Sequence, residues 1–216
     1  MGDSVWGYLQ IMFGWAVALL VIGMTPSAHA AMLINEVLAD PGGLDVNRDG
    51  VASATQDEFV ELVNTGSEAV SLAGWSLWDS VTKRHVFGEE LVIVSGGYLV
   101  IFGGGHPEGF TSALTASSGS LGLNNGGDTI TLYDATMSAI ASYTYDEALD
   151  GESWTRFPDG AGPFVGHASV SPLAFSPETG VNGSPSLPAV PEPLSMHLLG
   201  IGLLGLAVRR ILPTFR

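Results

Sequence analysis

The residues best suited to chemistry lie in one short stretch, Asp45-Val46-Asn47-Arg48-Asp49-Gly50-Val51. Three oxygen-bearing side chains, those of Asp45, Asn47 and Asp49, occupy alternate positions. Gly50 permits the tight turn that would direct them inward together. The main-chain carbonyl of Val51 would add another oxygen. Calcium takes about six to eight oxygen ligands, so this stretch predicts a Ca²⁺ site.

The second half of the stretch departs from the EF-hand calcium loop that its first half matches. Gln56 stands at the twelfth position, where a bidentate acid is expected, and carboxylates follow at Asp57 and Glu58. Asp57 reaches the ion if the loop is one residue longer. The alternative is an exposed hairpin whose Asp and Asn side chains only form side-chain-to-backbone turns. The predicted ligands are therefore Asp45, Asn47, Asp49, Val51 and Asp57.

Signals for catalysis are absent from the sequence. The chain has no cysteine for a thiol nucleophile and no Gly-x-Ser-x-Gly elbow. His85, His106 and His167 lack the close spacing of zinc ligands. We therefore predict that the protein is not an enzyme and has no catalytic residues.

A basic cluster and two tryptophans of the sequence could take part in binding a polysaccharide. Lys83-Arg84-His85 is the basic cluster of the central region, and it indicates either a solvated hairpin face or a contact for polysaccharide carboxylates. Trp78 and Trp154 are either core residues or a surface aromatic pair that could stack on a sugar ring.

The charge balance excludes one class of partner. The whole chain has a formal net charge of −15, with 20 acidic and 4 basic residues between Ala31 and Val190. Nucleic acid would be repelled by such a surface, whereas divalent cations would be attracted to it. Because cysteine is absent, no disulfide holds the fold outside the cell, and bound calcium or a large core must do so.

The central region predicts short strands separated by Gly- and Asn-rich turns, with no sustained helical period. The pattern is typical of an antiparallel β-sandwich over residues 31–175. Residues 176–189 are rich in Pro, Gly and Ser and predict an extended tether. The expected strands are residues 33–38, 58–64, 70–78, 84–87, 90–94, 98–102, 129–134, 139–145 and 153–157.

Several phrases of the central region go beyond a generic β pattern. They are Glu61-Leu62-Val63-Asn64, Leu72-Ala73-Gly74-Trp75 and Gly127-Asp128 with Leu132 four residues on. With Ile34-Asn35-Glu36-Val37 before them and Gly151-Glu152-Ser153-Trp154 after them, they resemble the bacterial lamin-tail domain over residues 32–183. The resemblance implies an all-β, immunoglobulin-like antiparallel β-sandwich with an adhesive or scaffolding role and no catalytic residues. Trp75 would then fill the gap between the sheets.

The N-terminal residues 1–30 predict a signal peptide. Residues 11–24 are almost wholly apolar, and Ala28 and Ala30 supply the small residues that signal peptidase recognises, with cleavage after Ala30. The segment is therefore expected to be a signal helix. A misplaced start codon or an uncleaved anchor remains an alternative, because no Lys or Arg precedes Arg48.

The C-terminal residues 190–216 predict a sorting signal. Val190-Pro191-Glu192-Pro193 ends the folded part, because proline is excluded from helix interiors and central strands. An apolar run over residues 194–208 predicts a transmembrane helix, and Arg209-Arg210 would stay on the cytoplasmic side. The three-part pattern resembles the PEP-CTERM signal of Gram-negative bacteria, which implies processing by an exosortase. An uncut anchor is the alternative.

Together these observations predict a non-enzymatic secreted or cell-surface protein that binds or scaffolds the extracellular polysaccharide matrix. Its precursor is expected to be anchored in the inner membrane before release to the surface or matrix. The predicted partners are signal peptidase, exosortase and extracellular polysaccharide, with no nucleic acid. The alternative is a hydrolase of matrix polymers or a nuclease accessory module.

Overall fold

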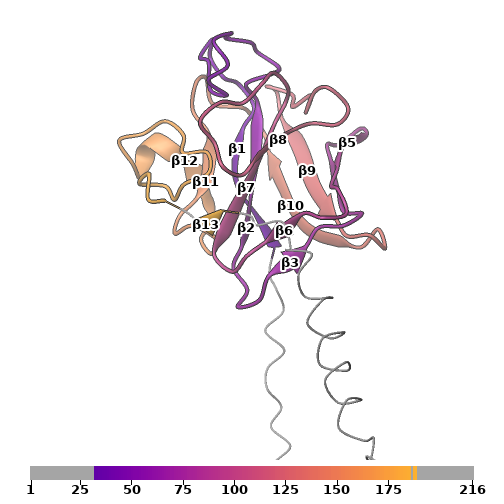
Figure 1. Ribbon diagram of the computed structural model, residues 1–216. Helices are drawn as coiled ribbons and strands as arrows, with labels where there is room; N and C mark the ends of the chain where they lie inside the picture. Colours follow the sequence, from indigo (N-terminus) through magenta and orange to yellow (C-terminus); the bar gives the residue numbers. More distant parts are fainter. Residues whose placement is uncertain (1–31, 186, 189–216) are drawn as a thin grey trace, which may run out of the picture.

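The computed structural model describes residues 32–185, 187 and 188, which form a sandwich of two main β-sheets (Figure 1). The larger sheet has seven strands in the order β12-β11-β1-β2-β7-β13, with β8 also paired to β7. Its strands are β1 (Met32–Leu38), β2 (Phe59–Asn64), β7 (Gly97–Phe102), β8 (Ala113–Thr115), β11 (Trp154–Arg156), β12 (Phe164–Gly166) and β13 (Leu187–Pro188).

The smaller sheet has the order β10-β9-β4-β5. It contains β4 (Ser76–Trp78), β5 (Lys83–Val86), β9 (Asp128–Tyr133) and β10 (Ala139–Tyr145), and β3 (Val70–Ser71) pairs with β6 (Val92–Ile93) beside it. All pairs are antiparallel except those of β8 and β13 with β7. Within the described residues the helical element is one short 3₁₀ turn, η1 (His167–Ser169). The predicted immunoglobulin-like β-sandwich is confirmed.

The main core lies between the two sheets and follows from alternation along the strands. Successive side chains of a strand point to opposite faces, so every second residue can be apolar and buried. The larger sheet contributes Val60, Leu62, Leu99 and Ile101, and the smaller sheet contributes Leu77, Ile130 and Leu132. The alternating apolar residues of the sequence therefore share one inner face, as the pattern predicts.

The opposite face of the larger sheet is also covered. At one end it carries a second apolar cluster with Phe59 and Phe102, whose rings pack edge to face with centroids 5.8 Å apart. Phe110 and Phe175, from segments far apart in the sequence, pack against this cluster. Polar side chains occupy the rest of this face, and they form the site described below.

The strands of the structure differ from the predicted ones near Gly74 and at β8 and β12. The strand expected over residues 70–78 is divided into β3 and β4, because Gly74 has a positive φ of 72° and the chain turns there. Trp75, in this turn, is half-buried against the main core rather than fully enclosed. The strands β8 and β12, three residues each, fall in stretches where no strand was expected.

The tether predicted over residues 176–189 is wrong for its described part. Residues 176–185 pack onto the larger sheet, and Ser176 and Val181 are only 4% and 3% exposed. Leu187 and Pro188 then pair with Gly97 and Tyr98 of β7. The Pro- and Gly-rich composition reflects turns fixed by tertiary contacts, and we call residues 176–185 together with β13 the C-terminal strap.

Over the described part of the chain, no helix has the length and apolar character needed to span a membrane. The signal helix with Ala28 and Ala30 and the transmembrane span of residues 194–208 lie outside the described residues.

Candidate functional site

Asp57 closes the predicted calcium loop by binding main-chain N–H groups. Its Oδ1 accepts hydrogen bonds from Val46 N at 2.7 Å and Asn47 N at 2.8 Å. Its Oδ2 accepts one from Ser53 N at 2.7 Å, and the side chain belongs to a fully buried residue. The structure thus brings Asp57 to the loop, where its carboxylate joins the loop's two ends.

The other predicted ligands bind within the loop in the same way. Asp45 Oδ2 accepts a hydrogen bond from Gly50 N, and Asn47 Oδ1 accepts one from Asp49 N. Asp49 accepts from Val51 N through Oδ1 and from His106 N through Oδ2, and the His106 bond is the main cause that lowers the Asp49 pKa. Among the residues that the structure describes, no three His, Cys, Asp or Glu side chains gather to hold a metal ion. These turns match the alternative interpretation of the loop, and calcium binding stays a prediction.

If calcium binds this loop, it stabilises the domain by mass action. At a calcium concentration of about 100 times the dissociation constant, the free energy of unfolding should rise by about 2.7 kcal/mol. Thermal melts in calcium and in chelator measure this change. The Asp45→Ala/Asp49→Ala variant is the control, and an equal response of the variant and the wild type would show that the ion does not bind at the loop.

Two carboxylates that the sequence prediction did not single out are buried under the C-terminal strap. Glu36 of β1 and Glu61 of β2 are directly opposite in the register, and both are 0% exposed. The register shifts between Ile34 and Glu36, so Asn35 is the extra residue of a β-bulge. The bulge turns the Asn35 amide toward Glu61, to which its Nδ2 donates a hydrogen bond of 2.9 Å.

Glu36 is bound by two serines from the C-terminal part of the chain. Its Oε1 accepts from Ser153 Oγ at 2.7 Å and from Ser176 N at 2.8 Å, and its Oε2 lies 2.8 Å from Ser176 Oγ. Ser176 Oγ is also 2.9 Å from His167 Nε2, while His167 Nδ1 lies 2.8 Å from the carbonyl of Leu173. Because a carbonyl only accepts, Nδ1 carries a proton.

The Ser176 hydroxyl therefore lies between the imidazole of His167 and the carboxyl group of Glu36. It has one proton to donate and two neighbours, His167 Nε2 and Glu36 Oε2. Both contacts are hydrogen bonds only if a second proton sits on Glu36 or on His167 Nε2. Burial raises the pKa of Glu36, and the nearby His167 and the serine hydrogen bonds partly oppose this rise. These hydrogen bonds close a buried network between β1, η1 and the start of the strap.

Glu61 accepts a hydrogen bond from the strap, and the neighbouring Glu36 affects its pKa. Its Oε2 accepts a hydrogen bond of 2.7 Å from Glu178 N. Burial raises its pKa well above the ordinary value, and the charge of Glu36 raises it further. Like charges directly opposite on neighbouring strands destabilise a sheet, so protonation of this pair favours the folded state.

Ser176, His167 and Glu36 are the residue types of a hydrolytic site, but their setting is that of a structural network. They are 4%, 0% and 0% exposed, so a substrate has no path to the serine hydroxyl. A nucleophile needs an exposed face next to its base. This arrangement instead attaches the strap to the sheet.

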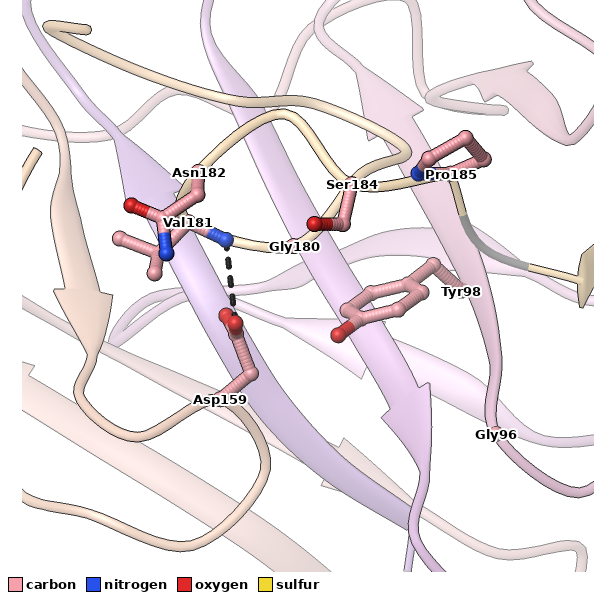
Figure 2. A pocket seen from close by; sticks show the side chains of 8 residues that line it. All are labelled: Gly96, Tyr98, Asp159, Gly180, Val181, Asn182, Ser184 and Pro185. Atoms are coloured by element: carbon pink, nitrogen blue, oxygen red, sulfur yellow. Dashed lines mark hydrogen bonds between the residues drawn. The ribbon is translucent and has the colours of Figure 1, made fainter. Parts of the chain in front are cut away.

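A shallow cavity of about 310 Å³ lies between the strap and the start of β7 (Figure 2). Figure 2 shows the Tyr98 hydroxyl directed toward Asp159, whose Oδ2 accepts a hydrogen bond of 3.0 Å from Val181 N. Burial raises the pKa of Tyr98, with Asp159 contributing next, so the hydroxyl stays protonated. A Cβ on Gly180 would stand 3.2 Å from Asp159, and a side chain there would narrow the cavity.

The outward face of the smaller sheet is the other candidate site. Ile130 and Leu132 of β9 point into the core, so the alternate residues Thr129, Thr131 and Tyr133 point outward. The register places Trp78 and Ser142 beside Thr131, with Lys83 beside Trp78 and Thr144 beside Thr129. We call these seven residues the aromatic–hydroxyl face: Trp78, Lys83, Thr129, Thr131, Tyr133, Ser142 and Thr144.

Side-chain contacts fix most of this face. The rings of Trp78 and Tyr133 pack edge to face, with centroids 5.9 Å apart at 74°, and Trp78 Nε1 donates to Ser76 Oγ at 2.9 Å. Two hydroxyl pairs lie beside the rings. Thr131 Oγ1 is 3.1 Å from Ser142 Oγ, and Thr129 Oγ1 is 2.8 Å from Thr144 Oγ1.

The basic cluster of the sequence is dispersed by the fold. Lys83 lies 5.8 Å over the Trp78 ring on the outward face. Arg84 donates to Asp79 Oδ2 through Nε and Nη2, and His85 is buried toward the core with a pKa lowered by burial. The three residues therefore do not form one basic surface. Trp154 donates through Nε1 to the carbonyl of Glu147 and packs against the core, so it does not pair with Trp78.

These observations define the class of the protein as an immunoglobulin-like β-sandwich with a buried polar network on its larger sheet. The chain belongs to the Lamin Tail Domain family, whose model matches residues 25–147. The PEP-CTERM protein-sorting motif matches residues 189–211, so the protein is exported as a membrane-anchored precursor and sorted by an exosortase of a Gram-negative bacterium. A comparison with curated proteins finds no match.

The matched regions divide the chain differently from the sequence prediction. The family model ends at residue 147, before the strands β11 and β12 and the strap that complete the larger sheet. The sorting residues, which are Val190, Pro191, Glu192, Pro193, Arg209 and Arg210, fall in the matched motif and outside the described residues.

Proposed function

We propose that the protein is a non-enzymatic binding or scaffolding component of the extracellular polysaccharide matrix. The sorting motif supplies its export and exosortase processing. The observation that carries the proposal is the contrast between the two sheets. Core and strap cover both faces of the larger sheet, whereas the outward face of the smaller sheet carries Ser142 and Thr144 exposed to solvent.

The alternative is a hydrolase or a nuclease accessory module, and the geometry favours it less. Its best candidate groups would be Glu36, Glu61, His167 and Ser176, all of which are buried. Two carboxylates of a glycoside hydrolase must flank a bound sugar, with water or a nucleophilic path between them. A pair sealed under main chain offers no such space.

The proposal also includes signal peptidase and matrix polysaccharide as partners and calcium as a bound ion. Signal peptidase would release the mature chain after Ala30, and calcium would occupy the loop of Asp45 in the extracellular medium. Matrix polysaccharide is the proposed binding partner, and the excess of acidic residues argues against nucleic acid as a partner.

Fractionation of the producing cells tests the proposed function. The mature protein is expected in the matrix fraction, with release by polysaccharide-degrading enzymes and retention after nuclease treatment. The purified protein should liberate no reducing ends from the isolated matrix and cut no oligonucleotide. Recovery only from the membrane fraction, or the appearance of cleavage products, would overturn the proposal.

A further inference from the structure

We propose that the aromatic–hydroxyl face binds a neutral polysaccharide chain. This inference rests on the proposed function and deepens it by naming the surface and the class of polymer. The face joins two aromatic rings to two pairs of hydroxyl groups on a single sheet, with one lysine at its side.

The charge of the face decides the class of polymer. None of its seven side chains is acidic, although the region from Ala31 to Val190 holds 20 acidic residues. A polyanion would be repelled by the body of the protein, and Lys83 is the single cation that the face offers it. A neutral polysaccharide carries no charge, so the acidic residues of the protein do not repel it.

The polar groups of the face match those of a sugar polymer. A hydroxyl both donates and accepts hydrogen bonds, so Thr131, Ser142 and their neighbours can exchange mutual bonds for bonds to sugar hydroxyls. The rings of Trp78 and Tyr133 meet edge to face at 74°, so one ring can offer its apolar face, and the other its edge, to the C–H groups of a sugar.

The face is already held in place before a ligand arrives. Trp78 is fixed by Ser76 and by Tyr133, and threonine is stiff about its first side-chain torsion. Little side-chain entropy is therefore lost on binding. Lys83 is exposed and can move away from the Trp78 ring.

The hydroxyl end of the face continues into a hollow of about 340 Å³. Thr129 and Thr144 line it together with the turn of Gly126 and Gly127. Asp128, also in its lining, has both oxygens occupied, since Oδ1 accepts from Ser80 N and Oδ2 accepts from Asn124 N. A chain lying along the hydroxyl pairs therefore has room to continue past the end of the sheet.

The test measures binding of residues 31–188, which carry every described strand and the whole core. The probes are phosphoric-acid-swollen cellulose, a soluble mixed-linkage β-glucan and dextran, and binding is read by depletion and by tryptophan fluorescence. Saturable binding to at least one probe is expected. Trp78→Ala/Tyr133→Ala and Thr129→Val/Thr131→Val should each weaken it at least 10-fold.

The control is Phe157→Ala, which removes an aromatic ring that is 42% exposed and lies outside the face. It should bind as the wild type does. The Thr→Val variant keeps the shape of both side chains, so it tests the face even if the aromatic variant unfolds. Melting temperatures establish that each variant is folded.

Three results would overturn the inference. They are no binding to any of the neutral probes, equal binding by the folded face variants, and a face that instead mediates self-association or adsorption to phosphatidylethanolamine–phosphatidylglycerol vesicles. If the native protein still fractionates with the matrix, the proposed function survives and only the assignment of this face fails.

Discussion

A chain that ends at residue 175 instead of residue 188 is expected to lose about 5 kcal/mol of unfolding free energy. Shortening it removes three main-chain donors from buried or half-buried carboxylates: Ser176 N from Glu36, Glu178 N from Glu61 and Val181 N from Asp159. A hydrogen bond contributes about 0.5–1.5 kcal/mol, or about 1.5–3 kcal/mol where its acceptor is charged, and a buried acceptor that loses its donor costs about 1–3 kcal/mol. The loss would approach the whole stability of a domain this size, which is about 5–15 kcal/mol.

Urea denaturation of residues 31–188 and of residues 31–175 measures this difference. Glu178→Gly is the matched variant, because it keeps the N–H bond to Glu61 and suits the positive φ of 68° while removing the carboxylate that binds Thr111 and Ser112. It should lose less than the truncation does. If the two chain lengths have the same denaturation midpoint, residues 176–188 are the passive tether that the composition indicated.

Raising the pH from 4.5 to 8 is expected to remove about 3 kcal/mol of stability through Glu58 alone. Glu58 is 3% exposed, and burial raises its pKa from 4.5 to about 7. Its hydrogen bond from Leu123 N, at 3.4 Å, and the charge of Arg84 offset only part of this rise, while Asp128 adds to it. One pKa unit corresponds to about 1.36 kcal/mol.

The sign follows from proton binding. Between pH 4.5 and 7 the folded protein holds the Glu58 proton and the unfolded chain does not, so stability falls as the pH rises. The stabilisation that the Glu58 proton provides is fully present below pH 4.5 and is lost as the pH rises through about 7. Denaturation of the wild type and Glu58→Gln across this range isolates the effect, since other titrating groups are common to both. Parallel curves for the two proteins would exclude this role of Glu58.

Local pattern was sufficient to predict most of the fold. Residues 98–102 and 139–145 form strands close to where alternation and turn residues place them. The prediction of one strand failed at residues 70–78, where apolar residues recur on both sides of Gly74 but the chain turns at this glycine. It also missed β8 and β12, because three-residue strands depend on neighbours that lie far along the sequence.

The buried carboxylates could not be predicted from their own strands. Glu36 and Glu61 alternate with apolar residues, which is the pattern of side chains facing water. What buries them is the strap, whose Pro- and Gly-rich composition is typical of a linker. The one available signal was the position of Glu36 and Glu61 on adjacent strands, which leaves two like charges opposite each other and requires a partner or a proton.

The strap also determines how the domain would respond to a mechanical load on its C-terminal end. Its attachments lie in series along the chain, from β13 at residue 188 back through Val181 and Glu178 to Ser176. A pull transmitted from the sorting end would reach them one at a time and meet the serine–carboxylate network last. The strands of the main core would be loaded only after these links had opened, so we expect the strap to detach before the sandwich unfolds.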